Sequence, residues 1–129
     1  PKRARPTREV TLLILTDPQG RVLLERRPAA GIWGGLWSFP ECPARQTPER
    51  WCRQTLKIRG IKSSGLPVIH HGFTHFVLKI YPQPVRLTGA ASAKIESRGR
   101  VWVQPGAPGR RGLAAPIKKL LEQLDKGYE

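Results

Sequence analysis

Residues 31–41 read Gly-Ile-Trp-Gly-Gly-Leu-Trp-Ser-Phe-Pro-Glu, a segment in which glycines, aromatic side chains and a closing carboxylate occur together. The adjacent glycines Gly34 and Gly35 permit a positive φ or a close backbone approach. Trp33 and the aromatic residues after it supply large apolar surfaces that must be buried or stacked. We therefore expect a shaped loop here, although a tight turn that feeds a short core strand explains the same residues equally well.

Upstream of this loop the sequence predicts a β-hairpin. Residues 10–16 are a nearly continuous apolar run, residues 17–20 read Asp-Pro-Gln-Gly, and residues 22–24 are again apolar. The tetrapeptide favours a type I turn, so the flanking runs become strands with a buried face. Residues 1–9 are basic and contain prolines without apolar periodicity, so we expect the flexible end of a connector there and one domain over residues 10–129.

Downstream of the loop the sequence predicts a helix over residues 48–57. Thr47 supplies an N-cap, Pro48 suits the first helical position and Glu49 places an acid in the first turn. The residues expected to face inward are Trp51, Thr55 and Leu56.

The second half of the chain predicts more strands and a last helix. Residues 68–71 and 75–81 are rich in β-formers around a Gly-Phe-Thr turn, which predicts a second hairpin or a bulged strand. Pro82 and Pro84 indicate the edge of a sheet, with short strands over residues 85–87 and 101–104. A last helix ending at Gly127 is predicted by apolar residues at helical spacing: Ile117, Leu120, Leu121 and Leu124. This order predicts an α+β fold, an α/β/α sandwich with a mixed sheet and two main helices.

The composition points to a polyanionic partner. The 129 residues include 23 Lys and Arg but only 9 Asp and Glu, a net charge of +14. Such an excess attracts polyanions, so a nucleic acid is the first partner to consider, although dispersed positive charge is also typical of merely basic domains. No apolar run is long enough to span a bilayer and no signal peptide is recognisable, so we expect a cytoplasmic protein without a membrane partner.

Metal and cofactor sites are not expected in this chain. Cys42 and Cys52 are the only cysteines, too few for a four-cysteine zinc or iron–sulfur site, so we expect two free thiols. His70, His71 and His75 lie close in sequence, but no carboxylate or cysteine accompanies them. Neighbouring residues of a strand also point to opposite faces, so these histidines are not expected to share a metal.

Gly35 and Glu41 have the spacing that opens the Nudix box. In that family the box continues with an Arg-Glu pair, an apolar residue and two glutamates that hold divalent cations against the substrate phosphates. The corresponding positions of this chain are occupied by Glu49, Arg50, Trp51, Arg53 and Gln54. Arginine cannot ligate a cation, so the resemblance implies a Nudix-like fold without Nudix hydrolysis.

Other residues resemble a more specific family. Arg27 and Pro28 precede the loop, residues 73–76 read Phe-Thr-His-Phe, and residues 112–116 read Gly-Leu-Ala-Ala-Pro before the leucine-rich last helix. In this order, residues 10–125 resemble the C-terminal domain of the MutY family of adenine DNA glycosylases. In that family an N-terminal domain with the catalytic carboxylates and a 4Fe-4S cluster excises adenine mispaired with guanine or 8-oxoguanine. The C-terminal domain recognises the 8-oxoguanine, so the resemblance implies a lesion-recognition domain of base excision repair.

The resemblance also implies roles for single residues. Family members usually carry Phe-Ser-His where this chain has Phe73, Thr74 and His75, and threonine keeps the hydroxyl. We therefore expect Thr74 to read N7 and O8 of 8-oxoguanine, His75 to contact a base edge or phosphate, and Phe73 to support the turn or act as a wedge. The possible phosphate contacts are Arg27, Arg50 and Arg53.

The expected partners are duplex DNA with an 8-oxoguanine:adenine pair and the N-terminal catalytic domain of the same protein. We expect a monomer that acts in the bacterial cytoplasm, at the nucleoid when bound to DNA, and no enzymatic activity of this chain by itself. Two alternatives stay open. One is a general basic module that binds nucleic acid or a repair protein, and the other is an active Nudix hydrolase with displaced metal ligands.

Overall fold

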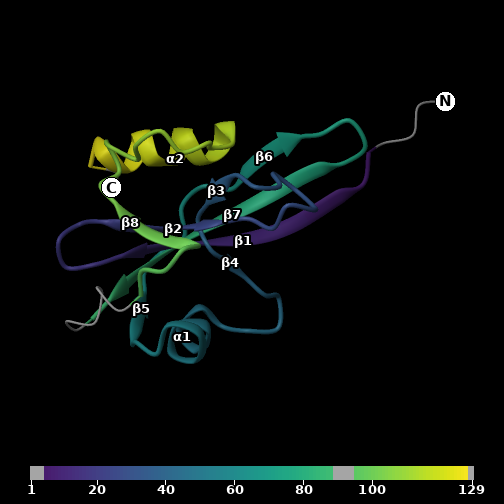
Figure 1. Cartoon of the computed structure of the whole chain (residues 1–129). Coiled ribbons are helices and arrows are strands. Elements are labelled where there is room, and N and C mark those ends of the chain that lie inside the picture. Colours follow the sequence, from purple (N-terminus) through teal and green to yellow (C-terminus); the bar gives the residue numbers. More distant parts are fainter. Residues whose placement is uncertain (1–4, 89–94, 128–129) are drawn as a thin grey trace.

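The protein is described from a computed structural model, which places residues 5–88 and 95–127. One mixed sheet lies between two helical segments on opposite faces (Figure 1). In chain order the elements are β1 (Thr7–Thr16), β2 (Val22–Arg26), β3 (Trp37–Ser38), β4 (Glu41–Cys42), α1 (Pro48–Trp51), a π-helical turn η1 (Cys52–Leu56), β5 (Gly60–Lys62), β6 (Ile69–Gly72), β7 (Val77–Leu87), β8 (Arg100–Val103) and α2 (Ala115–Asp125). The main path through the sheet is β3-β2-β1-β7-β5, and the α/β/α sandwich predicted from the sequence is confirmed.

The predicted first hairpin is confirmed, and a buried carboxylate holds its turn. Asp17 is 3% exposed. Its carboxylate accepts hydrogen bonds from the backbone N–H of Gln19 at 3.0 Å and of Arg21 at 2.8 Å, and from Nε of Arg21 at 2.7 Å. Gly20 closes the turn with a φ of +79°. These contacts fix where β1 ends and β2 begins.

β1 starts earlier than the sequence suggested. It pairs in parallel with β7 from Thr7↔Val77 to Thr16↔Arg86, so residues 7–9 belong to the sheet and not to a flexible connector. The signal was missed because these residues are exposed and polar, and their strand conformation depends on a partner far along the chain. Residues 1–4 of the predicted connector lie outside the described residues.

The prolines of β7 do not mark a sheet edge, which corrects the prediction. β7 runs unbroken through Pro82 and Pro84 and lies between β1 and β5. The carbonyl of Pro82 accepts from Leu66 N–H at 3.1 Å and that of Pro84 from Ser63 N–H at 3.2 Å, both on the side away from β1. The nitrogen and carbonyl of one strand residue point the same way. The missing N–H groups therefore face the gap between β5 and β6, and no bond to β1 is lost.

Apolar side chains of β1 alternate between two cores. Leu12 and Ile14 join α2, and Leu13 and Leu15 join α1 and η1 on the other face. In α2 the predicted leucine stripe is buried at Ile117, Leu120 and Leu121, and Gly127 follows the helix with a φ of +73°. The complete burial of such a side chain contributes roughly 1.5–3 kcal/mol, so α2 is held mainly by this stripe.

The predicted helix over residues 48–57 forms, but its second half is a π-helical turn. The hydroxyl of Thr47 accepts from Arg50 N–H at 3.1 Å, as expected of the N-cap, and Lys57 ends the turn with a φ of 59°. Trp51 and Leu56 are buried as predicted. Cys52 is fully buried instead of Thr55, which is half-buried, because the wider turn rotates the inward face. Within the described residues, no helix is long and apolar enough to cross a membrane.

Candidate nucleic-acid interface

The glycine-rich segment is a shaped loop that ends in the short strand β3. Trp33 has a φ of 53° and Gly35 a φ of 75°. A Cβ atom at Gly34 would collide with the carbonyl oxygen of Ala29, so this position requires glycine for close approach. Both reasons for expecting glycine are therefore met, one at each residue. The two explanations offered by the sequence also combine, because the loop leads into β3 and Phe39 is buried behind it.

Arg27 holds this loop from inside. Its Nε donates to the carbonyl of Ile32 at 2.8 Å, and its Nη2 lies 3.3 Å from a carboxylate oxygen of Glu41. Its side chain is only 18% exposed. The structure thus gives the guanidinium an internal role, where the sequence suggested a phosphate contact. The carboxylate that ends the loop is likewise engaged with Arg27.

An aromatic cluster joins the loop to the β6–β7 hairpin. It consists of Trp33, His71, Phe73 and Phe76. The rings of Phe73 and Phe76 stack with centroids 4.6 Å apart, and Trp33 lies 6.0 Å from Phe73. His71 meets Trp33 at 5.8 Å and Phe73 at 5.0 Å, both edge-on. Such ring pairs add roughly 0.5–1.5 kcal/mol each beyond their burial, so the hairpin turn is braced against the loop.

The turn of this hairpin presents its polar residues to solvent. Phe73 N–H donates to the carbonyl of Phe76 at 2.8 Å and closes a turn over residues 73–76. Thr74 and His75, between them, are exposed. Within the part of the chain that the structure describes, neither side chain has a hydrogen-bond partner. The Thr74 hydroxyl is therefore free to donate and accept.

Two more arginines flank the turn, Arg5 just before β1 and Arg8 within it, and neither was predicted as a site residue. Nη1 of Arg5 donates to the carbonyl of Phe73 at 2.7 Å, and the guanidinium of Arg8 lies 4.9 Å above the ring of Phe76. Both are exposed. The sequence did contain a sign of this position. Alternate residues of a strand share one face, so Arg8 lies on the same face of β1 as Val10 and Leu12, whose core the hairpin aromatics contact.

A cavity of about 250 Å³ lies beside the aromatic cluster, between β1 and the shaped loop. Its apolar wall includes Val10, Leu12 and Trp33, and its rim carries Arg8 and Glu41. Trp33 is shared by the cavity and the cluster. A substitution at Trp33 would therefore affect both.

Arg50 and Arg53 lie elsewhere. Both are exposed on α1 and η1, and this helical segment packs on the opposite face of the sheet from the core that contacts the aromatic cluster. Figure 1 shows α1 and the β6–β7 turn well apart. The structure thus brings together Trp33, Phe73, Thr74 and His75 but separates them from these two arginines. Phosphate contacts by Arg50 and Arg53 stay a prediction.

The described residues contain no group of three His, Cys, Asp or Glu side chains placed to hold a metal ion. The segment that carries the metal-binding glutamates in a Nudix hydrolase has Glu49 as its single carboxylate here. Burial and the nearby Glu41 and Glu49 raise the pKa of Cys42, and burial raises the pKa of Cys52 to about 12. Both thiols are free and stay protonated at neutral pH, which makes them poor nucleophiles.

Comparison with known proteins assigns the chain to a family. Residues 11–123 match the NUDIX domain family. The chain belongs to this family. The NUDIX domain is also similar to adenine DNA glycosylases of Buchnera aphidicola. With that of subspecies Acyrthosiphon pisum it shares 25% identity over 118 residues, which cover 92% of this chain and 33% of the relative. With that of subspecies Schizaphis graminum it shares 24% identity over 104 residues, which cover 81% of this chain and 30% of the relative. The chain thus spans about a third of the length of these relatives.

Solved structures share the fold of this NUDIX domain. The C-terminal domain of mouse MUTYH, solved in complex with human PCNA, superposes with a TM-score of 0.61 at 19% identity, covering 92% of this chain and 87% of that chain. MutT protein from Methanosarcina mazei Go1 superposes with a TM-score of 0.66 at 15% identity, covering 97% of each. The predicted resemblance, to a Nudix-like domain of adenine DNA glycosylases, is confirmed.

Proposed function

We propose that this NUDIX domain recognises 8-oxoguanine opposite a mispaired adenine, as part of a longer adenine DNA glycosylase. The observation that carries the proposal is the Thr74 hydroxyl, exposed and unpartnered within the described residues at the tip of a braced hairpin. A residue that only filled the turn would not need a rigid aromatic support behind it.

The chemistry of the lesion fits a hydroxyl. Guanine presents acceptors at N7 and O6 in the major groove, whereas 8-oxoguanine carries a hydrogen on N7 and a new carbonyl oxygen at C8. A hydroxyl can accept from the first and donate to the second. Thr74 would thus form bonds with the lesion that it cannot form with guanine.

The neighbouring residues divide the other tasks. His75, exposed beside Thr74, would contact a base edge or a phosphate, and Phe73 would support the turn through its stack on Phe76. Arg5 and Arg8 lie next to the turn and would neutralise phosphates on either side of the lesion. Phosphate contacts position the duplex, whereas the turn supplies the selectivity.

Excision of adenine would belong to another domain of the same protein. We propose that the catalytic carboxylates and a 4Fe-4S cluster lie there, that the residues before β1 connect the two domains, and that the monomeric enzyme acts on chromosomal DNA in the bacterial cytoplasm. Cys42 and Cys52 are buried and free, and two cysteines do not make a four-cysteine ligand set.

Nudix hydrolysis is the competing function, and the family match is what favours it. That chemistry needs several carboxylates around divalent cations, but the helical segment here carries only Glu49 and two cations, Arg50 and Arg53. We therefore propose that the chain hydrolyses no nucleotide. Magnesium-dependent release of phosphate or pyrophosphate from 8-oxo-dGTP would contradict this.

Chemical-shift mapping tests the recognition proposal. The isotope-labelled chain is titrated with duplexes that differ only in an 8-oxoguanine:adenine, guanine:adenine or thymine:adenine pair. We expect shifts at residues 73–76 and at Trp33 that are largest with 8-oxoguanine, and shifts at Arg5 and Arg8 with all three. Equal shifts at the turn with all duplexes would reduce the domain to a general nucleic-acid binder.

A further inference from the structure

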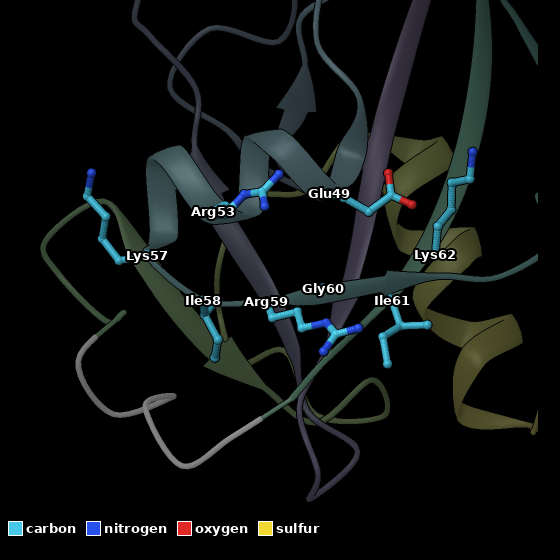
Figure 2. A pocket seen from close by; sticks show the side chains of 8 residues that line it. All are labelled: Glu49, Arg53, Lys57, Ile58, Arg59, Gly60, Ile61 and Lys62. Atoms are coloured by element: carbon cyan, nitrogen blue, oxygen red, sulfur yellow. The ribbon is translucent and has the colours of Figure 1, made fainter.

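A second candidate recognition surface lies at the β5 end of the sheet. It is a groove of about 670 Å³ between the α1–η1 segment and β5, and we call it the basic groove. Its polar lining includes the cations Arg53, Lys57, Arg59 and Lys62 and one carboxylate, Glu49. In Figure 2, Lys57 and Lys62 lie toward opposite ends and Arg59 lies between them.

None of the four cations of the basic groove is paired with an acid among residues 5–88 and 95–127. Among the described residues, the ion pairs involve Arg21, Arg27, Lys79 and Arg100, and no side chain of the groove. Arg53, Lys57, Arg59 and Lys62 are all exposed and form no described side-chain hydrogen bond. A concave surface with four such charges attracts an acidic ligand.

The groove also exposes apolar surface. Ile61 is 39% exposed, and the only other large hydrophobic residue that the structure describes as exposed is Val68. Ile61 is the central residue of β5, between the chain positions of Arg59 and Lys62. An isoleucine kept in solvent among cations indicates a ligand that offers apolar contacts as well as negative charge.

Among the strands that the structure describes, β5 pairs with one neighbour only. It pairs with β7, through Ile61↔Arg86 among other residues, and is the last strand on the main path through the sheet. An edge strand can accept an extended chain through backbone hydrogen bonds. The shape and the exposed strand therefore suit an extended peptide.

We propose that the basic groove binds an extended acidic segment of a partner protein, with an apolar residue of that segment on Ile61 and its carboxylates beside the four cations. Nucleic acid fits less well, because phosphates would neutralise the cations but leave Ile61 exposed. The groove lies between α1–η1 and the β5 edge, and Figure 1 shows α1 well apart from the β6–β7 turn, so the domain can hold a lesion and a partner protein at the same time.

A binding assay with synthetic peptides tests this proposal on the full chain. The probe is a fluorescein-labelled peptide of alternating aspartate and leucine, followed by fluorescence anisotropy. The comparison probes are an aspartate–serine peptide of the same charge and a single-stranded thymidine oligonucleotide. We expect the aspartate–leucine peptide to bind at least about 10-fold more tightly than the aspartate–serine peptide, since only the former covers Ile61.

Two sets of variants localise the binding. Arg59→Glu with Lys62→Glu should weaken binding of the aspartate–leucine peptide at least about 10-fold. The matched control, Lys118→Glu with Lys119→Glu on the exposed face of α2, makes the same charge change and should have an effect below about 2-fold. Ile61→Ser leaves the charge unchanged and should reduce the preference for the leucine peptide.

The outcomes separate the occupants. If Ile61→Ser has no effect, or the oligonucleotide binds this groove more tightly than the aspartate–leucine peptide, the groove is a general polyanion site and the proposal fails. Ile61 is exposed, so its variant gives a test even if the double charge reversal unfolds the domain. Thr74→Ala should leave peptide binding unchanged, which keeps this result independent of the lesion-recognition proposal.

Discussion

Thr74→Val removes a hydroxyl and keeps the size and branching of the side chain, so it tests the lesion contact without changing the shape of the turn. Thr74 is exposed and has no hydrogen-bond partner among the described residues, so its replacement should change the free energy of unfolding by less than about 0.5 kcal/mol. The substitution should instead weaken the complex with lesion-containing DNA, because the hydrogen bond to the base is lost. A hydrogen-bonded base contact contributes roughly 1–3 kcal/mol of discrimination, which corresponds to about 5- to 150-fold in rate or affinity.

The assay is single-turnover excision of adenine by the intact glycosylase that contains this domain. Rates are measured on duplexes with 8-oxoguanine:adenine and guanine:adenine. We expect Thr74→Val to lower the ratio of the two rates by this factor, mainly by slowing the reaction opposite 8-oxoguanine. Thr74→Ser, which retains the hydroxyl, is the matched control and should keep the ratio. If the valine variant keeps the wild-type ratio, the hydroxyl does not read the lesion.

Three other predictions concern the loop, the phosphate contacts and the thiols. Gly34→Ala should lower the free energy of unfolding by about 1–3 kcal/mol through its clash with the Ala29 carbonyl, whereas Gly99→Ala, which meets no atom within 4 Å, should be nearly neutral in the same thermal melts. Arg8→Glu should weaken binding to lesion and normal duplexes alike and lower the slope of log affinity against log salt by about one, and Arg50→Glu should change it less; equal slopes for the two variants would place α1 against DNA. The pKa of Cys52 is raised from 9.0 to about 12, so its contribution to stability is complete below pH 9 and is lost as the pH rises toward 12. Cys52→Ala should remove that part of the alkaline loss in pH-dependent melts, and an unchanged pH profile would argue against this origin.

Elements with a local signature could be predicted from the sequence. The Asp-Pro-Gln-Gly turn predicted the first hairpin, and the leucine spacing with a following Gly127 predicted α2. Glycine chemistry also predicted a shaped loop at Gly34 and Gly35, which the backbone angles and the close approach confirm. In each case the physical cause acts within a few residues.

Features that depend on distant partners could not be predicted in this way. Pro82 and Pro84 predict a sheet edge because a missing N–H usually disrupts a sheet, but both nitrogens face the gap between β5 and β6. Ile32 and Glu41 are internal partners of Arg27 that the local sequence does not reveal, and a phosphate contact by Arg27 stays a prediction. The residues next to these positions do not show which strand a backbone nitrogen will face or which distant side chain an arginine will contact.

The same limit applies to the candidate site. Phe73, Thr74 and His75 were adjacent in sequence and stay together on one turn. Arg50 and Arg53 are predicted as phosphate contacts from their charge, but the helical segment that carries them packs on the opposite face of the sheet from the core that contacts the turn. Arg5 and Arg8 were missed because their neighbour is a turn about 70 residues later in the chain.

Because β1 is buried on both faces, its apolar side chains do not by themselves determine its register with the neighbouring strands. Leu12, Leu13, Ile14 and Leu15 are all fully or almost fully buried, so a slip of the strand by one residue would still offer leucine or isoleucine to both faces. Hydrophobicity alone therefore does not distinguish the correct frame from its neighbour. The Asp17 carboxylate limits that choice on one side of β1, because its three hydrogen bonds to residues 19 and 21 fix the turn and with it the alignment of β1 against β2.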